Sequence, residues 1–219
     1  MGLFLAMSGV ANASRAAVED ALRAYATEKS GTLEAADAFA DPSDALLIAD
    51  MGGHVTVMYP GEFMQWDEAA QYLSRALSTS VFSLHIHDED LWMYVLFSKG
   101  EQVDQFNPIP DYWNDTVSDA ERRAWAGAAA VVAQHWPGVV PEAIREYLHE
   151  WDLDVEDSDS RVPHPNNCIA GRLWRRLHRG TYALWVGAGA APAVVSLTQR
   201  QADDQNHDAK VGPSPPWRT

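Results

Sequence analysis

Three strand-like runs follow one another in this sequence with almost nothing between them. Residues 81–87, 91–98 and 102–106 are rich in aliphatic, aromatic and β-branched side chains, and only short polar connectors separate them. Connectors this short cannot hold a crossover helix, so neighbouring runs must pair antiparallel. This feature predicts a three-stranded antiparallel meander.

The first strand of the meander has one apolar and one more polar face. Along residues 82–87, large apolar side chains alternate with Ser83, His85 and His87. Because successive side chains of a strand point to opposite faces, the two histidines are expected on one face and the core on the other.

A second strand pair precedes the meander. Apolar runs at residues 45–49 and 54–59 flank the glycine-containing segment 50–53, which is typical of a hairpin. Apolar residues at helical spacing, with start signals at Ser118 and Pro141, indicate four helices. These helices are expected between Ser14 and Gly31 and over residues 67–76, 118–134 and 141–151. The order predicts an α+β fold with an antiparallel sheet of about five strands packed with helices.

The two ends of the chain lack the pattern of strands and helices that its middle shows. Residues 1–7 are apolar but lack a cationic flank, so we interpret them as a start region rather than a secretory signal. The acidic run 152–160 resembles a linker. We therefore predict an acidic globular domain over residues 1–151 and a linker with a basic, poorly ordered extension over 152–219. The basic block Arg172–Arg179 in this extension could fold back on the acidic domain or engage a second partner.

Charge is unevenly distributed along the chain. Residues 1–150 hold 23 acidic and 8 basic side chains, whereas residues 151–219 hold 8 of each. The net charge of −15 disfavours nucleic acid and anionic membranes and attracts basic proteins. The alternative is that the charge serves solubility alone.

Two observations bear on the compartment of the protein and on whether it spans a membrane. Cys168 is the only cysteine, which excludes an internal disulfide and is compatible with a reducing compartment. No apolar run of about 18 residues is present, so a membrane span is not expected. We therefore expect a cytoplasmic protein.

His85 and His87 are the strongest candidates in the chain for metal ligands. Side chains two apart on a strand can reach one metal ion, and the acidic turn 88–90 follows directly. Imidazole and carboxylate ligands would favour zinc, iron(II) or manganese. A third ligand would have to come from His54, Asp104 or Asp111. The alternative is a hydrogen-bonded histidine pair on a half-buried sheet face.

Other enzyme templates are missing from the sequence. No phosphate-binding glycine loop, nucleophile elbow or His-Glu-x-x-His motif is found. The sequence thus favours a non-enzymatic role, and it assigns no cofactor.

Aromatic and acidic side chains are interleaved between residues 92 and 115. Rigid aromatic groups beside carboxylates suit an interface that receives lysine or arginine from a partner. The predicted partner-binding residues are Trp92, Asp104, Asp111, Tyr112 and Trp113. The alternative is that the helices after residue 118 cover the strand face of Trp92 and make it core.

These observations predict an acidic, cytoplasmic protein-interaction module, of inhibitor or immunity-like type, that binds a basic protein partner. The alternative function is a metal-dependent enzyme that uses His85, His87 and a carboxylate.

Overall fold

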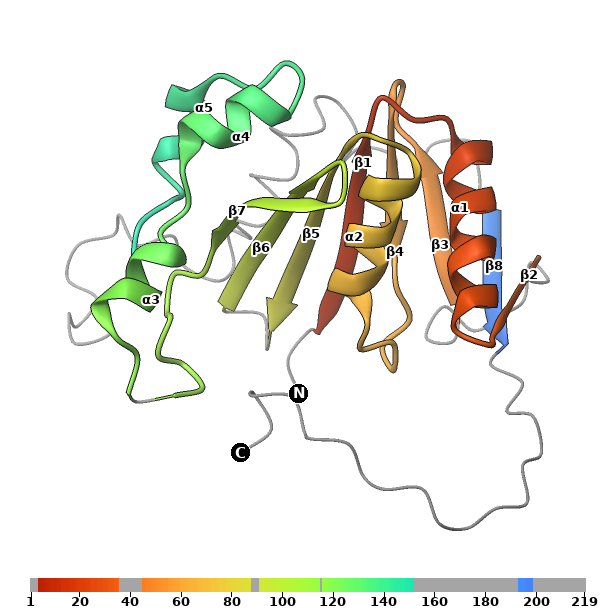
Figure 1. The fold of residues 1–219 in the computed structure, drawn as a ribbon, viewed down its shortest axis with the longest axis horizontal. Coiled ribbons are helices and arrows are strands. Elements are labelled where there is room, and N and C mark those ends of the chain that lie inside the picture. Colours follow the sequence, from red (N-terminus) through yellow and green to blue (C-terminus); the bar gives the residue numbers. More distant parts are fainter. Residues whose placement is uncertain (1–3, 36–44, 88–90, 115, 152–192, 199–219) are drawn as a thin grey trace, which may run out of the picture.

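The computed structural model describes residues 4–35, 45–87, 91–114, 116–151 and 193–198, the last of these by their backbone. The described strands form one sheet of eight, in the order β2-β8-β3-β4-β1-β5-β6-β7, and every neighbouring pair is antiparallel (Figure 1). The strands are β1 (Leu5–Ala11), β2 (Thr32–Ala35), β3 (Ala45–Asp50), β4 (His54–Met58), β5 (Ser80–His87), β6 (Leu91–Ser98), β7 (Glu101–Phe106) and β8 (Ala193–Thr198). The α+β class and the antiparallel sheet are thereby confirmed.

The predicted meander and hairpin are both present. The meander consists of β5, β6 and β7, and the hairpin consists of β3 and β4. Gly52 and Gly53 adopt positive φ angles of 71° and 105° in the hairpin turn, which glycine accommodates without a Cβ clash. The Asp50 side chain accepts a hydrogen bond from the Gly52 amide at 2.9 Å.

The strand at the centre of the sheet was not predicted. β1 pairs with β4 on one side and with β5 on the other, so it joins the hairpin to the meander. Leu5–Met7, which the sequence analysis interpreted as part of a start region rather than of a secretory signal, belong to β1. The small residues Ser8 and Gly9 weaken the strand signal in the sequence. The strand is stabilised by its pairing with β4 and β5 rather than by the intrinsic strand propensity of its residues.

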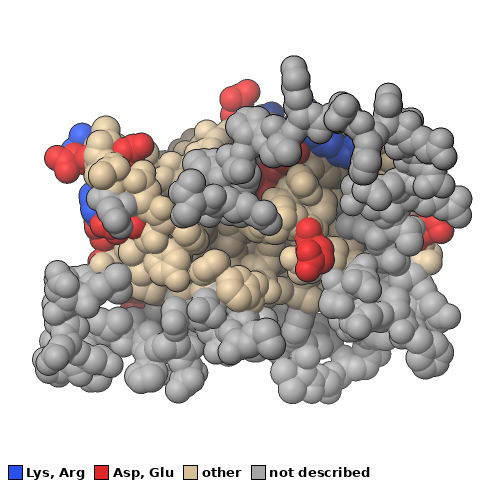
Figure 2. Space-filling model, turned by 90° about the horizontal axis from the view of Figure 1, so that it is seen from below, with Lys and Arg blue, Asp and Glu red and all other residues tan. Residues whose placement is uncertain are grey.

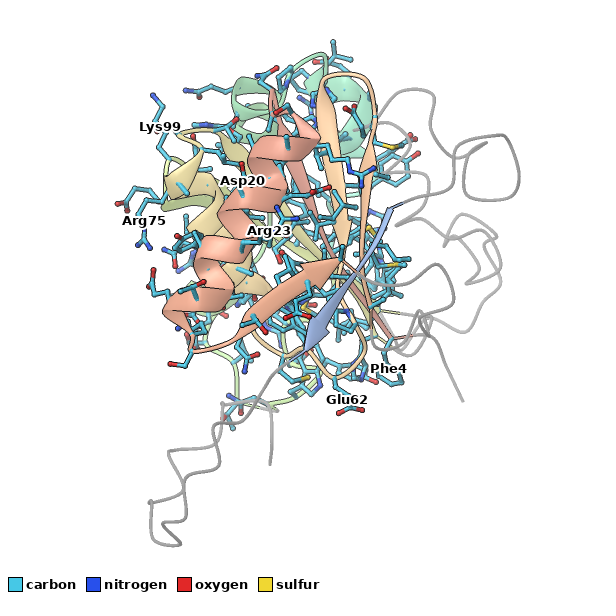
Figure 3. The ribbon with its side chains drawn as sticks, turned by 90° about the vertical axis from the view of Figure 1, so that its right-hand side faces the viewer. Phe4, Asp20, Arg23, Glu62, Arg75 and Lys99 are labelled. Carbon is cyan, nitrogen blue, oxygen red and sulfur yellow. The ribbon has the colours of Figure 1, made fainter. Side chains whose placement is uncertain are left out.

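Two helices cover one face of the sheet. The helices α1 (Arg15–Glu28) and α2 (Trp66–Ala76) bury apolar side chains against the same face, and Figure 3 shows α1 lying on one side of the strands. Ser14 caps α1 by accepting a hydrogen bond from the Ala17 amide at 3.3 Å. We call this side the α1–α2 face.

Three shorter helices follow the meander: α3 (Asp119–Ala124), α4 (Ala129–His135) and α5 (Pro141–Arg145). α4 and α5 contribute Val132, Trp136 and Ile144 to a second core on the opposite face, over β5, β6 and β7. The predicted helix over 118–134 is thus two helices, separated at Gly127, whose φ angle is +67°. The Ser118–Glu121 capping box is present, and the helix starting at Pro141 ends at Arg145, before the predicted end.

One strand comes from the predicted C-terminal extension. β8 pairs with β2 and β3, so residues 193–198 belong to the sheet. The acidic run 152–160, Cys168 and the basic block 172–179 lie outside the described residues, and the boundary near 152 stays a prediction. None of the described helices is both long and apolar enough to cross a bilayer.

Candidate functional site

The end of the sheet where β5 stops carries a cluster of aromatic rings around His87. The ring of Phe4 lies edge-on to the imidazole with centroids 4.7 Å apart. Tyr112 and Trp113 make similar contacts at 5.6 and 5.4 Å, and they contact each other at 4.9 Å. Edge-to-face pairs in this range stabilise one another beyond their burial. Residues 4, 87, 112 and 113 are called the aromatic cluster below.

Part of this cluster is open to solvent. Phe4 is 56% exposed and Tyr112 is 46% exposed, whereas Trp113 is half-buried and packs against the small core of Leu91, Met93 and Ile109. Trp113 therefore anchors the loop, and Tyr112 presents an aromatic surface outward.

The loop that carries Tyr112 and Trp113 is held by backbone hydrogen bonds. The Asn107 side chain accepts from the Ile109 amide at 2.9 Å, and the Asn107 amide donates to the Trp125 carbonyl at 3.0 Å. The Trp151 amide donates to the Pro108 carbonyl at 2.8 Å. Pro108 and Pro110 further restrict the backbone of this loop, so its aromatic side chains are presented on a stiff support.

Asp111 borders the cluster and is engaged by Arg122. The guanidinium donates to Asp111 Oδ2 at 2.5 Å and also pairs with Glu150. The hydrogen bond from Arg122 lowers the pKa of the Asp111 carboxyl below its ordinary value. This ion pair ties the loop to α3 and to the end of the segment after α5.

Two of the five predicted partner-binding residues lie elsewhere. Trp92 is 2% exposed and packs against Phe106 at 4.9 Å under α4 and α5. Asp104 accepts from the Tyr94 hydroxyl at 2.7 Å and from the Ala128 amide at 3.1 Å, and burial raises its pKa. The face of Trp92 is thus core, as the alternative interpretation held, and we no longer place Trp92 or Asp104 on the candidate surface.

His85 and His87 share the α1–α2 face, yet their environments differ. The Trp66 indole N–H donates to His85 Nδ1 at 3.1 Å, so Nε2 of the neutral ring carries the proton and faces Asp67 Oδ1 at 3.1 Å. Although burial opposes ionisation of Asp67, hydrogen bonds from His85 and Ser83 hold its pKa below the ordinary value. His87 instead contacts aromatic rings.

The described residues offer no third ligand to the histidine pair. No group of three or more His, Cys, Asp or Glu side chains that could hold a metal ion is found among them. His54 lies on the opposite face, stacked on Trp136 at 5.4 Å, while Asp104 and Asp111 have the partners given above. The acidic turn 88–90 lies outside the described residues.

The arrangement of Ser83, His85 and Asp67 is not that of a catalytic triad. Ser83 Oγ and Asp67 Oδ1 both approach the same ring nitrogen, Nε2, at 3.3 and 3.1 Å. A relay requires the nucleophile and the acid on opposite nitrogens of the imidazole. Ser83 is also fully buried, so this network serves to fix α2 on the sheet.

Sequence reasoning missed two exposed residues at this end, Phe4 and Met64. Met64 is 39% exposed and lies in the connection between β4 and α2. Phe4 could have been identified as a site residue from its position directly before a strand, but the sequence analysis did not predict β1.

The fold and this surface define an α+β protein with an exposed aromatic end. Comparison of the chain with protein-family models, with curated proteins and with solved structures gave no significant match.

Proposed function

We propose that this chain is an acidic, cytoplasmic protein-interaction module that binds a basic protein partner through the loop of Asp111, Tyr112 and Trp113. The observation that carries the proposal is Tyr112: a large aromatic side chain, 46% exposed, on a loop fixed by hydrogen bonds. A rigid aromatic group loses little conformational entropy on binding, which makes such residues frequent interface hot spots.

The charge of the chain supports a basic partner. A net charge of −15 accelerates association with a cationic protein and slows encounters with nucleic acid or anionic lipid. An inhibitor or immunity-like role is the sharpest form of this proposal, because such proteins neutralise a target by covering its surface. The metal-dependent alternative is not favoured by any observation on the described residues.

The test is capture of the tagged chain's partners from extracts of its own cells at low and high salt. We expect a stoichiometric basic protein that is retained at low salt, released at high salt and lost with Asp111→Lys. The matched control is Asp20→Lys on the outer side of α1 (Figure 3), whose carboxylate is also exposed. Equal capture by both variants would overturn the proposal.

Near-ultraviolet circular dichroism establishes whether each variant is folded. Because Asp111→Lys also removes the ion pair with Arg122, Asp111→Asn serves as a second variant. It removes the charge while keeping a side-chain acceptor, and we expect it to weaken capture by less than Asp111→Lys.

A further inference from the structure

The exposed apolar side chains of this protein concentrate at one end. Among the described residues, the exposed large hydrophobic side chains are Phe4, Met64, Tyr112 and Val140. Phe4 precedes β1, Met64 follows β4 and Tyr112 contacts the last residue of β5. Since β1 runs antiparallel to both β4 and β5, its start and their ends meet at the same end of the sheet.

Contacts join the segments that carry these residues. The Tyr59 amide, just after β4, donates to the Ala6 carbonyl of β1 at 3.0 Å, and Phe63 stacks on Tyr59 at 5.0 Å. On the other side, Phe4 contacts His87, which contacts Tyr112. Phe4 therefore lies between the connection that carries Met64 and the loop that carries Tyr112.

This end also carries carboxylates. Glu62 is exposed and lies at the same end as Phe4 (Figure 3). No Lys or Arg of the described residues forms a salt bridge with Glu62. Two cations near this end are already engaged, Arg122 with Asp111 and Lys29 with Glu68. In Figure 2, which looks at this end, residues other than Lys, Arg, Asp and Glu make up most of the described surface, and both acidic and basic side chains are visible beside them.

Resting on the function proposed above, we infer that the binding face extends beyond the loop, across Phe4 to Met64 and Glu62. Its occupant is a basic segment of the partner protein in which arginine or lysine alternates with apolar side chains. The apolar groups pack on Phe4, Met64 and Tyr112, and a cation pairs with Glu62. Charge complementarity selects this occupant, because a second copy of the chain would bring like carboxylates together.

The test uses a defined probe, a fluorescein-labelled peptide of alternating arginine and leucine. A peptide of the same length with glutamate in place of arginine is the charge control. Binding is measured by fluorescence anisotropy at low and moderate salt. We expect only the arginine peptide to bind, and failure of that peptide to bind would overturn the inferred occupant.

Four variants locate the extension of the binding face, and Tyr112→Ser tests the loop itself. We expect Met64→Ser and Glu62→Lys each to weaken binding by roughly fivefold or more, with the Glu62→Lys effect shrinking as salt rises. Val140→Ser and Asp20→Lys are matched controls, being equally apolar or acidic and exposed elsewhere. Both should bind as wild type.

The outcomes separate the two proposals. If Tyr112→Ser loses binding while Met64→Ser and Glu62→Lys bind as wild type, the loop interface stands and its extension is wrong. If the captured partner ignores Asp111 and Tyr112, the proposed function itself is wrong. If Asp20→Lys weakens binding as much as Glu62→Lys does, the peptide responds only to net charge; if Val140→Ser weakens it as much as Met64→Ser does, binding is not specific to this end of the sheet. In either case the extension is again wrong.

Discussion

Tyr112 and Trp113 are adjacent in sequence but have opposite roles. Trp113 packs against Leu91, Met93 and Ile109, whereas Tyr112 remains 46% exposed. The sequence is sufficient to predict that this aromatic, acidic segment is a stiff loop, because its two prolines restrict the backbone of the segment itself. It could not predict that Trp92 is core, since that depends on α4 and α5 packing over β6.

At the residue scale, the Asp111–Arg122 pair makes a pH-dependent contribution to stability. The pKa of Asp111 is lowered in the folded protein, so the unfolded chain binds the proton more readily and acid favours unfolding. The stabilisation is present at neutral pH and is lost as pH falls through the folded pKa, below the ordinary carboxyl value. Because both side chains of the pair are exposed to solvent, we expect this contribution to be small.

The measurement is urea unfolding of wild type and Asp111→Asn from pH 7 down to pH 2.5. We expect the difference in free energy of unfolding to be constant from neutral pH to about pH 5 and to shrink below about pH 4. A difference that stays constant to the lowest pH would show that the ion pair contributes nothing through its charge.

Gly127 provides a second prediction at this scale. Its φ angle is +67°, and an added Cβ would lie 3.1 Å from the Phe106 Cβ and from the Tyr94 hydroxyl. Gly127→Ala should cost about 2–3 kcal/mol, through backbone strain and the displaced core. Gly138 has a φ angle of +77° with no atom within 4 Å of an added Cβ, so Gly138→Ala should cost only the strain, about 1 kcal/mol. Equal losses in a denaturant titration would contradict the close packing at Gly127.

At the element scale, the sheet combines predictable and unpredictable strands. β5, β6 and β7 follow from local alternation and short connectors, and β3 and β4 follow from the glycine turn. β1 lacks a strong strand signal, and its role depends on the neighbours that it pairs with. β8 pairs with β2 and β3 from more than 140 residues along the chain, a distance over which sequence patterns carry no pairing information.

The buried hydroxyl pair between Ser8 and Tyr59 tests the placement of β1. Ser8 Oγ and Tyr59 Oη are 2.8 Å apart, and both residues are buried. Ser8→Ala should cost about 1–3 kcal/mol, because it leaves the tyrosine hydroxyl without a partner. In a double-mutant cycle with Tyr59→Phe, the double variant should lose about 1 kcal/mol less than the sum of the single variants. Strict additivity would contradict the contact.

At the scale of the whole molecule, the two ends of the sheet differ in what they present. The end with the aromatic cluster carries three of the four exposed large hydrophobic residues named above, and Val140 lies apart from them on the segment before α5. The net charge of −15 adds a long-range attraction for cations, which speeds association and weakens as salt screens it. The proposed interaction module would use both features, the apolar end for contact and the net charge for association.

The most direct measurement compares Tyr112→Ser with Val140→Ser in capture from the source cells. Both variants remove one exposed apolar side chain, and each is confirmed as folded by near-ultraviolet circular dichroism. We predict that the basic partner is retained by wild type and Val140→Ser and lost by Tyr112→Ser. Equal retention by all three chains, or a captured partner that is acidic, would contradict the account.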